Sequence, residues 1–207
     1  MELYQKKNLS MIEQQANKVL HFHGPFSFTK GEKSLFHSEF VKSEGIYIWT
    51  IKDKKNKINY FHYIGETSSF GKRQREHFVQ MTGLNYRIYN PDSASQGIVE
   101  IIWNGMWKDR TNDAVGNLIE NYNLITNKVI NYIKIINVYF APTSFDREMR
   151  KHIEGCIGWN LRNKYKEAKL FYPDDNHIGT KSIGKIGETI NIILDEKIFG
   201  IDEQLFI

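Results

Sequence analysis

Cysteine is almost absent from this chain of 207 residues, in which Cys156 is the single one. One cysteine excludes an intramolecular disulfide, and it excludes any zinc site built from two or more cysteines. The scarcity of cysteine is typical of proteins from a reducing compartment, so we expect a cytoplasmic location.

Long apolar runs and linkers are missing as well. No run reaches the roughly 18 apolar residues that a membrane span requires. The N-terminal segment mixes acids and bases without an apolar centre, which is not typical of a signal peptide. With four prolines, 41% hydrophobic and 25% charged residues, the composition indicates one globular domain. Lys plus Arg number 28 against 24 Asp plus Glu, an excess that permits a polyanionic partner without requiring one.

Two short strings carry most of the information: GIY at 45–47 and YIG at 63–65. Each stands in a segment rich in β-branched and aromatic residues, 45–51 and 58–65, and a polar turn at 53–57 separates them. This pattern predicts an antiparallel hairpin. Strands usually avoid glycine, so the glycines of both strings indicate the close approach of another group.

Periodicity and turn residues predict the other elements. We expect Asn112 to cap a helix whose core stripe includes Val115, Ile119 and Tyr122, together with Leu118 and Val129. A capping box formed by Thr143 and Asp146 is expected to open the long helix that follows. The predicted order is a helix over 10–21, a loop over 21–33, a helix over 70–81, a strand over 97–103, a helix over 113–130, a third core strand over 131–141, a helix over 145–168, and a tail packed on the core as a strand or helix.

The order of these features resembles the GIY-YIG endonuclease family, whose members cut phosphodiester bonds in DNA. The resemblance rests on the two tripeptides, on Arg73 eight residues after the second one, and on His77 four residues further. It implies an α+β fold with a small three-stranded antiparallel sheet flanked by helices. The single domain, 1–207, would comprise an N-terminal arm (1–42), a nuclease core (43–176) with an insertion at 84–131, and a C-terminal extension (177–207).

The same resemblance implies a set of catalytic residues. Tyr47 and Tyr63 match the tyrosines of the two strings, and Arg73 and His77 share one helix face because they are four residues apart. An arginine fork suits phosphate oxygens. Each of these side chains could equally be structural: the tyrosines as core aromatics, Arg73 as part of a solvated basic string, and His77 as a structural histidine.

A metal ligand and an asparagine complete the set that the resemblance implies. Glu154 stands beside an apolar helix stripe and is the expected ligand of one Mg²⁺ or Mn²⁺, with Glu148 and Glu167 as rivals on the same helix. Asn176 lies in the string PDDN, which is similar to the P-x-x-N that closes the family motif, and Asn160 and Asn163 compete with it.

Basic residues suggest where nucleic acid would lie. Lys72, Arg75 and Arg150 could line a groove for the phosphate backbone. Within the insertion, Lys108 and Arg110 stand close to Trp103 and Trp107, and a binding role for these tryptophans competes evenly with burial in the core.

The expected function is that of a Mg²⁺-dependent endonuclease acting on double-stranded DNA, most like a small type II restriction enzyme, with a homodimer as one option for its assembly. One alternative is a non-catalytic nucleic-acid-binding module on the same scaffold. Another is a structure-specific repair or recombination nuclease, which the sequence does not separate from the first interpretation.

Overall fold

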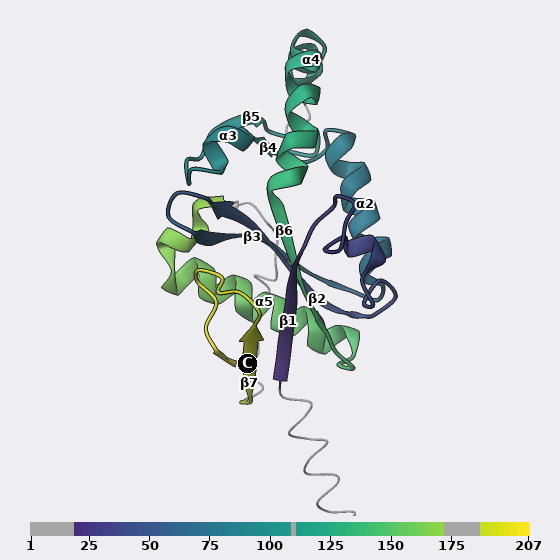
Figure 1. Ribbon diagram of the computed structural model, residues 1–207. Coiled ribbons are helices and arrows are strands. Elements are labelled where there is room, and N and C mark those ends of the chain that lie inside the picture. Colours follow the sequence, from purple (N-terminus) through teal and green to yellow (C-terminus); the bar gives the residue numbers. More distant parts are fainter. Residues whose placement is uncertain (1–18, 109–110, 172–186) are drawn as a thin grey trace, which may run out of the picture.

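A six-stranded mixed sheet forms the centre of the molecule, with helices on both faces (Figure 1). The computed structural model describes residues 19–108, 111–171 and 187–207. The strand order is β3-β2-β6-β1-β7-β8, antiparallel throughout except for the parallel pair β1–β7. The strands are β1 (Val19–Phe26), β2 (Gly45–Asp53), β3 (Ile58–Thr67), β6 (Ile136–Pro142), β7 (Thr189–Leu194) and β8 (Gln204–Phe206).

The prediction of a small three-stranded antiparallel sheet is therefore wrong. The three predicted strands do lie side by side as β3-β2-β6, but they form only one half of the sheet. Strand β1, from the arm, and strands β7 and β8, from the C-terminal extension, supply the other half. Parallel pairing of β1 with β7 joins segments that are about as far apart in sequence as the chain allows, and no local sequence signal reports such a pairing.

Strand β1 replaces two predicted elements. Residues Val19–His21, assigned to a helix, and residues up to Phe26, assigned to a loop, are extended. Gly24 and Pro25 indicated a loop, but the register shift between His23 and Phe26 accommodates them as an irregularity within the strand. The remainder of the predicted helix over 10–21 lies outside the described residues.

Helix α2 (Phe70–Thr82) follows the hairpin as predicted, and α5 (Arg147–Lys164) follows β6. The cap of α5 is Asp146 itself, whose carboxylate accepts the Met149 N–H, so the capping box led by Thr143 is wrong. Residues Lys166–Phe171 form a separate 3-10 turn, η2, after α5 ends. A second such turn, η1, covers Leu35–His37.

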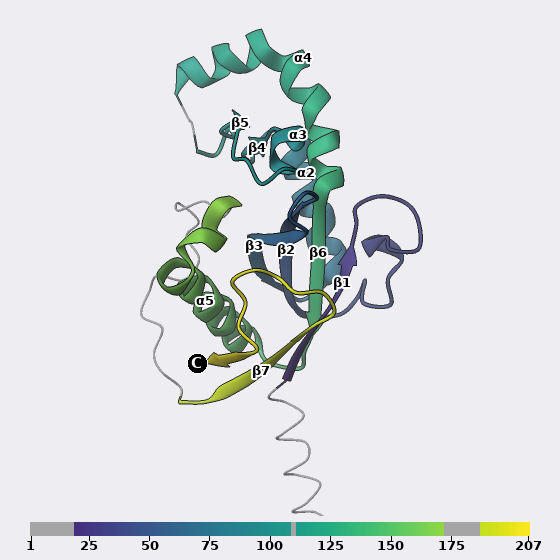
Figure 2. The same cartoon turned by 60° about the vertical axis from the view of Figure 1, so that its left-hand side comes forward.

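Helix α4 (Asn112–Ile135) differs most from expectation. Thr111, not Asn112, caps it by accepting the Ala114 N–H. Its last residues, 131–135, were assigned to the third strand, which begins only at Ile136. Its first half projects away from the sheet (Figure 2), so Ile119 is 73% exposed, whereas the second half, including Val129, packs in the core. In the first half, Ala114 is buried and Leu118 packs against the core cluster. Among the described helices, none combines the length and apolar character needed to cross a bilayer.

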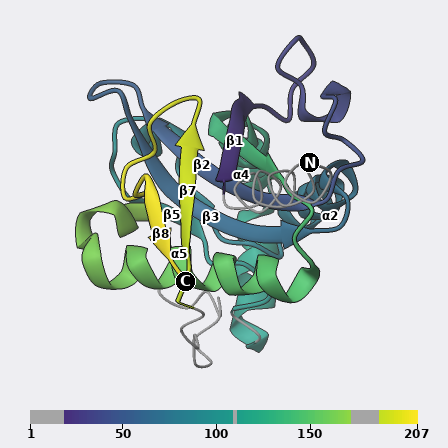
Figure 3. The same cartoon turned by 90° about the horizontal axis from the view of Figure 1, so that it is seen from below.

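Two apolar clusters cover the two faces of the sheet. On one face, Ile46 and Ile48 of β2 pack with Ile153 and Ile157 of α5, which runs along the sheet in Figure 3. On the other face, Tyr47 and its neighbours pack against α2, α4 and the insertion. The insertion contributes β4 (Ile88–Tyr89), α3 (Pro91–Ala94) and β5 (Ile101–Trp103), where β5 is shorter than the strand predicted over 97–103.

Candidate active site

The predicted hairpin is present, and its register brings the two motif tyrosines together. Tyr47 pairs with Gly65, and Trp49 pairs with Tyr63, so both tyrosines lie on the sheet face that α2 covers. Their rings stack with centroids 6.0 Å apart. A side-chain carbon at Gly65 would overlap the Tyr47 hydroxyl, and one at Gly45 would overlap the Ala141 carbonyl. The close approach that the glycines indicated is thus made by the protein itself.

Four side chains form a continuous hydrogen-bonded chain on this face. Arg73 Nε donates to the Tyr47 hydroxyl oxygen at 3.4 Å, and that hydroxyl lies 2.6 Å from His77 Nε2. On the far side of the ring, His77 Nδ1 lies 2.9 Å from the Tyr86 hydroxyl. Tyr47 and His77 are fully buried, whereas the Arg73 side chain is 39% exposed and pairs with Glu76 at 3.0 Å.

The protons of this chain follow from charge and burial. Desolvation and the nearby Arg73 lower the pKa of His77 to about 3, so the imidazole is neutral at pH 7 and has one acceptor nitrogen and one donor nitrogen. Burial raises the pKa of Tyr47 well above its ordinary value, although Arg73 opposes the shift. An arrangement that satisfies every group has Tyr47 donating to Nε2 and Nδ1–H donating to Tyr86.

Glu154 approaches the same place from the opposite side of the sheet. It lies on α5, which packs against β3, an edge strand, and its carboxylate accepts the backbone N–H of Glu66. The negative charge of Glu154 raises the pKa of Tyr47 and of Tyr63. In turn, the positive charge of Arg73 lowers the pKa of Glu154. Burial, reinforced by the Glu66 carboxylate, raises the pKa of Glu154 to about 7.

Arg73 and Lys151 lower the pKa of Glu154 and offset the effect of burial only in part. A carboxylate is the kind of oxygen ligand that Mg²⁺ binds, so Glu154 is the residue of this site that could hold such an ion.

Arg150 has a structural place. Its side chain is 3% exposed and forms ion pairs with Glu44 at 2.7 Å and with Glu66 at 3.3 Å. It also donates to the Phe145 carbonyl at 2.6 Å. A guanidinium buried among these partners does not reach a DNA backbone, so we correct its predicted role: Arg150 neutralises Glu66 beside Glu154.

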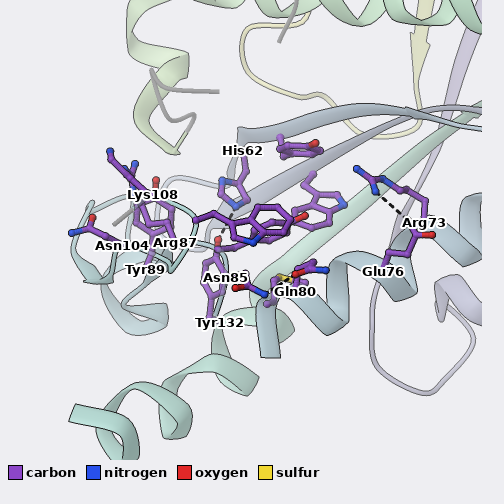
Figure 4. A pocket seen from close by; sticks show the side chains of 15 residues that line it. His62, Arg73, Glu76, Gln80, Asn85, Arg87, Tyr89, Asn104, Lys108 and Tyr132 are labelled. Atoms are coloured by element: carbon purple, nitrogen blue, oxygen red, sulfur yellow. Dashed lines mark hydrogen bonds and ion pairs between the residues drawn. The ribbon is translucent and has the colours of Figure 1, made fainter. Parts of the chain in front are cut away.

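Two hollows flank Arg73 and Glu76, which line both. The larger has a volume of 690 Å³ and is lined by Tyr63, Tyr86 and Lys108 among others. Figure 4 shows Lys108 and Arg73 at its two ends. The smaller, of 470 Å³, is lined by Lys72 and Arg147 together with the β3–α2 turn. A chain of phosphates lying along this surface would pass over Arg73.

The other predicted residues are placed as follows. Arg75 is exposed on another face of α2, and Lys108 is exposed at the larger cavity. Arg110 and Asn176 lie outside the described residues. Asn163, a rival of Asn176, is exposed and donates to the Trp159 carbonyl of its own helix, and Asn160 is partly buried on α5.

The two tryptophans of the insertion behave differently. Trp103 is 7% exposed and donates its indole N–H to the Leu84 carbonyl, which makes it a core residue. Trp107 is 53% exposed, lines the larger cavity and packs edge-on against Tyr86. The insertion therefore presents the exposed Trp107 and Lys108 beside Tyr63 and Arg73.

Several site residues were missed from the sequence. Tyr86 belongs to the insertion, and nothing in its local sequence relates it to His77. Gln74, which accepts the Trp49 indole N–H at 2.9 Å, looks like an ordinary helix residue. Glu66 had a usable sequence signal, since it directly follows the YIG string.

Comparisons with known proteins provide no independent identification. No protein-family model, no curated protein and no solved structure matches this chain.

Proposed function

We propose that this protein is a Mg²⁺-dependent endonuclease that hydrolyses phosphodiester bonds in double-stranded DNA by the chemistry of the GIY-YIG family. The observation that carries the proposal is the hydrogen-bonded chain of Arg73, Tyr47 and His77 on one face of the sheet, with the Tyr63 ring stacked beside Tyr47. Glu154, on α5 at the other face, acts on both tyrosines electrostatically. The proposal depends on these side chains and not on the overall fold, which differs from the expected one.

Arg73 is the charge stabiliser in this mechanism. Its ion pair with Glu76 is exposed, and such pairs contribute little, about 0–1 kcal/mol. A phosphate can therefore replace Glu76 as the partner of the Arg73 guanidinium, whose N–H groups can donate to two phosphate oxygens. Because Arg73 covers the Tyr47 hydroxyl in the resting arrangement, this movement also opens Tyr47 to the attacking water.

Tyr47 receives the proton of that water. Its raised pKa makes a resting phenolate unfavourable, so we propose a concerted transfer. As the Tyr47 oxygen takes a proton from water, its own proton moves to His77 Nε2, and the Nδ1 proton of His77 moves to Tyr86, which releases its proton to the cavity. Buried behind Tyr47, His77 serves this relay and does not reach the leaving oxygen.

Glu154 would hold the magnesium ion, and a bound ion would supply positive charge to the phosphate and to the attacking water. Release of a proton from Glu154 is required first, because a protonated carboxyl does not bind a cation. With a pKa of about 7, Glu154 gives the site a pH-dependent metal affinity that rises through neutrality.

Trp107 and Lys108 would contact the duplex beside the cut. An exposed aromatic next to a lysine suits base or sugar contact with phosphate neutralisation. We infer a restriction-like enzyme in the cytoplasm, with the insertion selecting the target. Two sites in a dimer would cut both strands in one binding event, so the proposal includes a homodimer, and the exposed Ile119 and Tyr122 on the projecting half of α4 suit a subunit contact.

The decisive experiment incubates the untagged protein with supercoiled plasmid and with phage DNA, with Mg²⁺ and with a chelator. We expect nicked and linear products only with the metal. Arg73→Ala should lose activity by on the order of 100-fold or more. Arg75→Ala is the matched comparison, since it removes an exposed arginine from another face of the same helix, and it should lose far less activity than Arg73→Ala even if Arg75 contacts the DNA backbone.

DNA binding without cleavage under all these conditions would favour the non-catalytic binding module. Cleavage confined to branched or flapped oligonucleotides would favour a repair or recombination nuclease. Metal-dependent cleavage that is equal in the wild type and in Arg73→Ala would contradict the proposed site.

A further inference from the structure

A second cluster of chemistry-bearing side chains lies where β1 meets β7, and the proposed nuclease reaction does not use it. Among the residues that the structure describes, His21, His23 and Asp195 form the one group whose ligand atoms all lie within 4.8 Å of one another. His21 and His23 come from the N-terminal arm, and Asp195 comes from the C-terminal extension.

The strand geometry explains how the group forms. In β1, Leu20 and Phe22 point into the core and are fully buried, so His21 and His23 share the opposite face of the strand. Strand β7 runs parallel to β1 with Phe22 opposite Leu194, which places Asp195 level with His23. The Asp195 backbone N–H donates to the Phe22 carbonyl, which holds the two segments in this register.

The distances fit coordination of an ion after small side-chain rotations. His21 Nε2 lies 2.6 Å from Asp195 Oδ1, and His23 Nδ1 lies 3.8 Å from Asp195 Oδ2. Two ligand atoms at about 2.0–2.2 Å from a tetrahedral ion lie about 3.3–3.6 Å apart. The observed separations fall on either side of that value, and rotations of the two imidazoles and the carboxylate can equalise them.

Neighbouring groups hold the ligands in place. The Gly24 N–H donates to Asp195 Oδ2 at 3.0 Å, a contact of the kind that orients a ligating carboxylate. The His23 ring stacks on Phe40 with centroids 4.8 Å apart, which restricts its rotation. All three side chains are partly exposed, between 32% and 41%, so an ion can enter from solvent and one coordination position remains open to water.

From this geometry we propose that His21, His23 and Asp195 bind one first-row transition-metal ion, with zinc as the chemically favoured occupant, and that the ion fastens the C-terminal extension to the arm. Imidazole nitrogens favour zinc over magnesium. The proposal is therefore independent of the magnesium site at Glu154 and of the nuclease activity.

Zinc binding is the test. Untagged, chelator-treated protein is titrated with ZnCl₂ by calorimetry, and the thermal unfolding midpoint is measured with and without zinc. We expect one equivalent of zinc to bind and the midpoint to rise. Substitution with Co²⁺ should give visible absorption bands of a low-coordinate nitrogen–oxygen site. Mg²⁺ should neither bind to this site nor raise the unfolding midpoint.

The His21→Ala/His23→Ala double variant should lose at least 10-fold in zinc affinity. Asp195→Asn should weaken binding while keeping a side chain that accepts the Gly24 N–H, and it serves as the second test if the double variant unfolds. His37→Ala removes an exposed histidine elsewhere and should change nothing.

Zinc affinity that is unchanged in both His21→Ala/His23→Ala and Asp195→Asn would overturn the proposal. Loss of binding in His152→Ala would also overturn it, because His152 Nε2 lies 3.7 Å from the Cys156 thiol and is the alternative zinc ligand on α5. Absence of zinc binding to the wild-type protein would overturn it directly.

Discussion

Replacing Glu154 with glutamine should stabilise the metal-free protein, and the gain should depend on pH. Between the ordinary glutamic acid pKa of 4.5 and the raised value of about 7, the folded protein binds a proton that the unfolded chain has released. The free energy of unfolding of the wild type therefore falls as pH rises through this window. In the Glu154→Gln variant the side chain does not titrate, so the free energy of unfolding does not fall for this reason.

The magnitude follows from the shift. A difference of about 2.5 pKa units corresponds to about 3 kcal/mol, which is an upper figure because part of the side chain is exposed. For a domain of this size, 3 kcal/mol changes the unfolding midpoint by about 6–12 °C. At pH 8 the unfolding midpoint of the Glu154→Gln variant should exceed that of the wild type by up to this amount, and at pH 4.5 the two midpoints should nearly coincide.

Urea and thermal unfolding at pH 4.5, 6 and 8, in the presence of a chelator, measure this directly. The control is Glu148→Gln on the same helix, where the side chain is 82% exposed and the change should stay below about 1 kcal/mol at every pH. Adding Mg²⁺ at pH 8 should stabilise the wild type and leave Glu154→Gln unchanged. Parallel pH profiles for the wild type and Glu154→Gln would refute the reasoning.

Three further perturbations test separate parts of the site. Tyr47→Phe should fold, with a free energy of unfolding about 1–3 kcal/mol lower than that of the wild type because the buried His77 Nε2 loses its hydrogen-bond partner. It should cleave plasmid very slowly, with little recovery at high pH. Cleavage at the wild-type rate would show that the general base is another residue. Gly65→Ala should lower the free energy of unfolding by about 1–3 kcal/mol in urea, because the added methyl group overlaps Tyr47. Gly116→Ala is the control: it has open space around it on a helix and should raise the free energy of unfolding by about 0.5–1 kcal/mol. Equal changes in the two variants would contradict the overlap at Gly65. Lys108→Ala should weaken duplex binding in fluorescence anisotropy and reduce the salt slope by about 0.9, and unchanged affinity would remove the insertion from the interface.

The local elements of the hairpin and of α2 were predictable because their signals are local. Alternating β-branched and aromatic residues, a polar turn and helical spacing all act within about 15 residues of one another. The same signals place Tyr47 beside Tyr63 and put Arg73 and His77 on one helix face. The prediction that another group closely approaches Gly65 of the YIG string is confirmed, and that group is the Tyr47 side chain.

The rest of the sheet was not predictable for a physical reason. Strand β1 carries polar histidines and a Gly-Pro pair, and it becomes a strand only because β6 and β7 pair with it from both sides. Residues 131–135 are apolar enough for a strand, yet they continue α4, because a buried helix and a buried strand look alike over a few residues. Arg150 was misassigned because its partners Glu44 and Glu66 lie more than 80 residues away in sequence.

The most direct test of the central claim is Mg²⁺-dependent plasmid cleavage by the wild type and by Glu154→Gln, measured at pH 8 beside duplex binding by anisotropy. The account predicts that the wild type cleaves with Mg²⁺ and that the variant binds DNA with similar affinity but does not cleave. Cleavage by Glu154→Gln at the wild-type rate, or no cleavage by the wild type on any duplex offered, would contradict it.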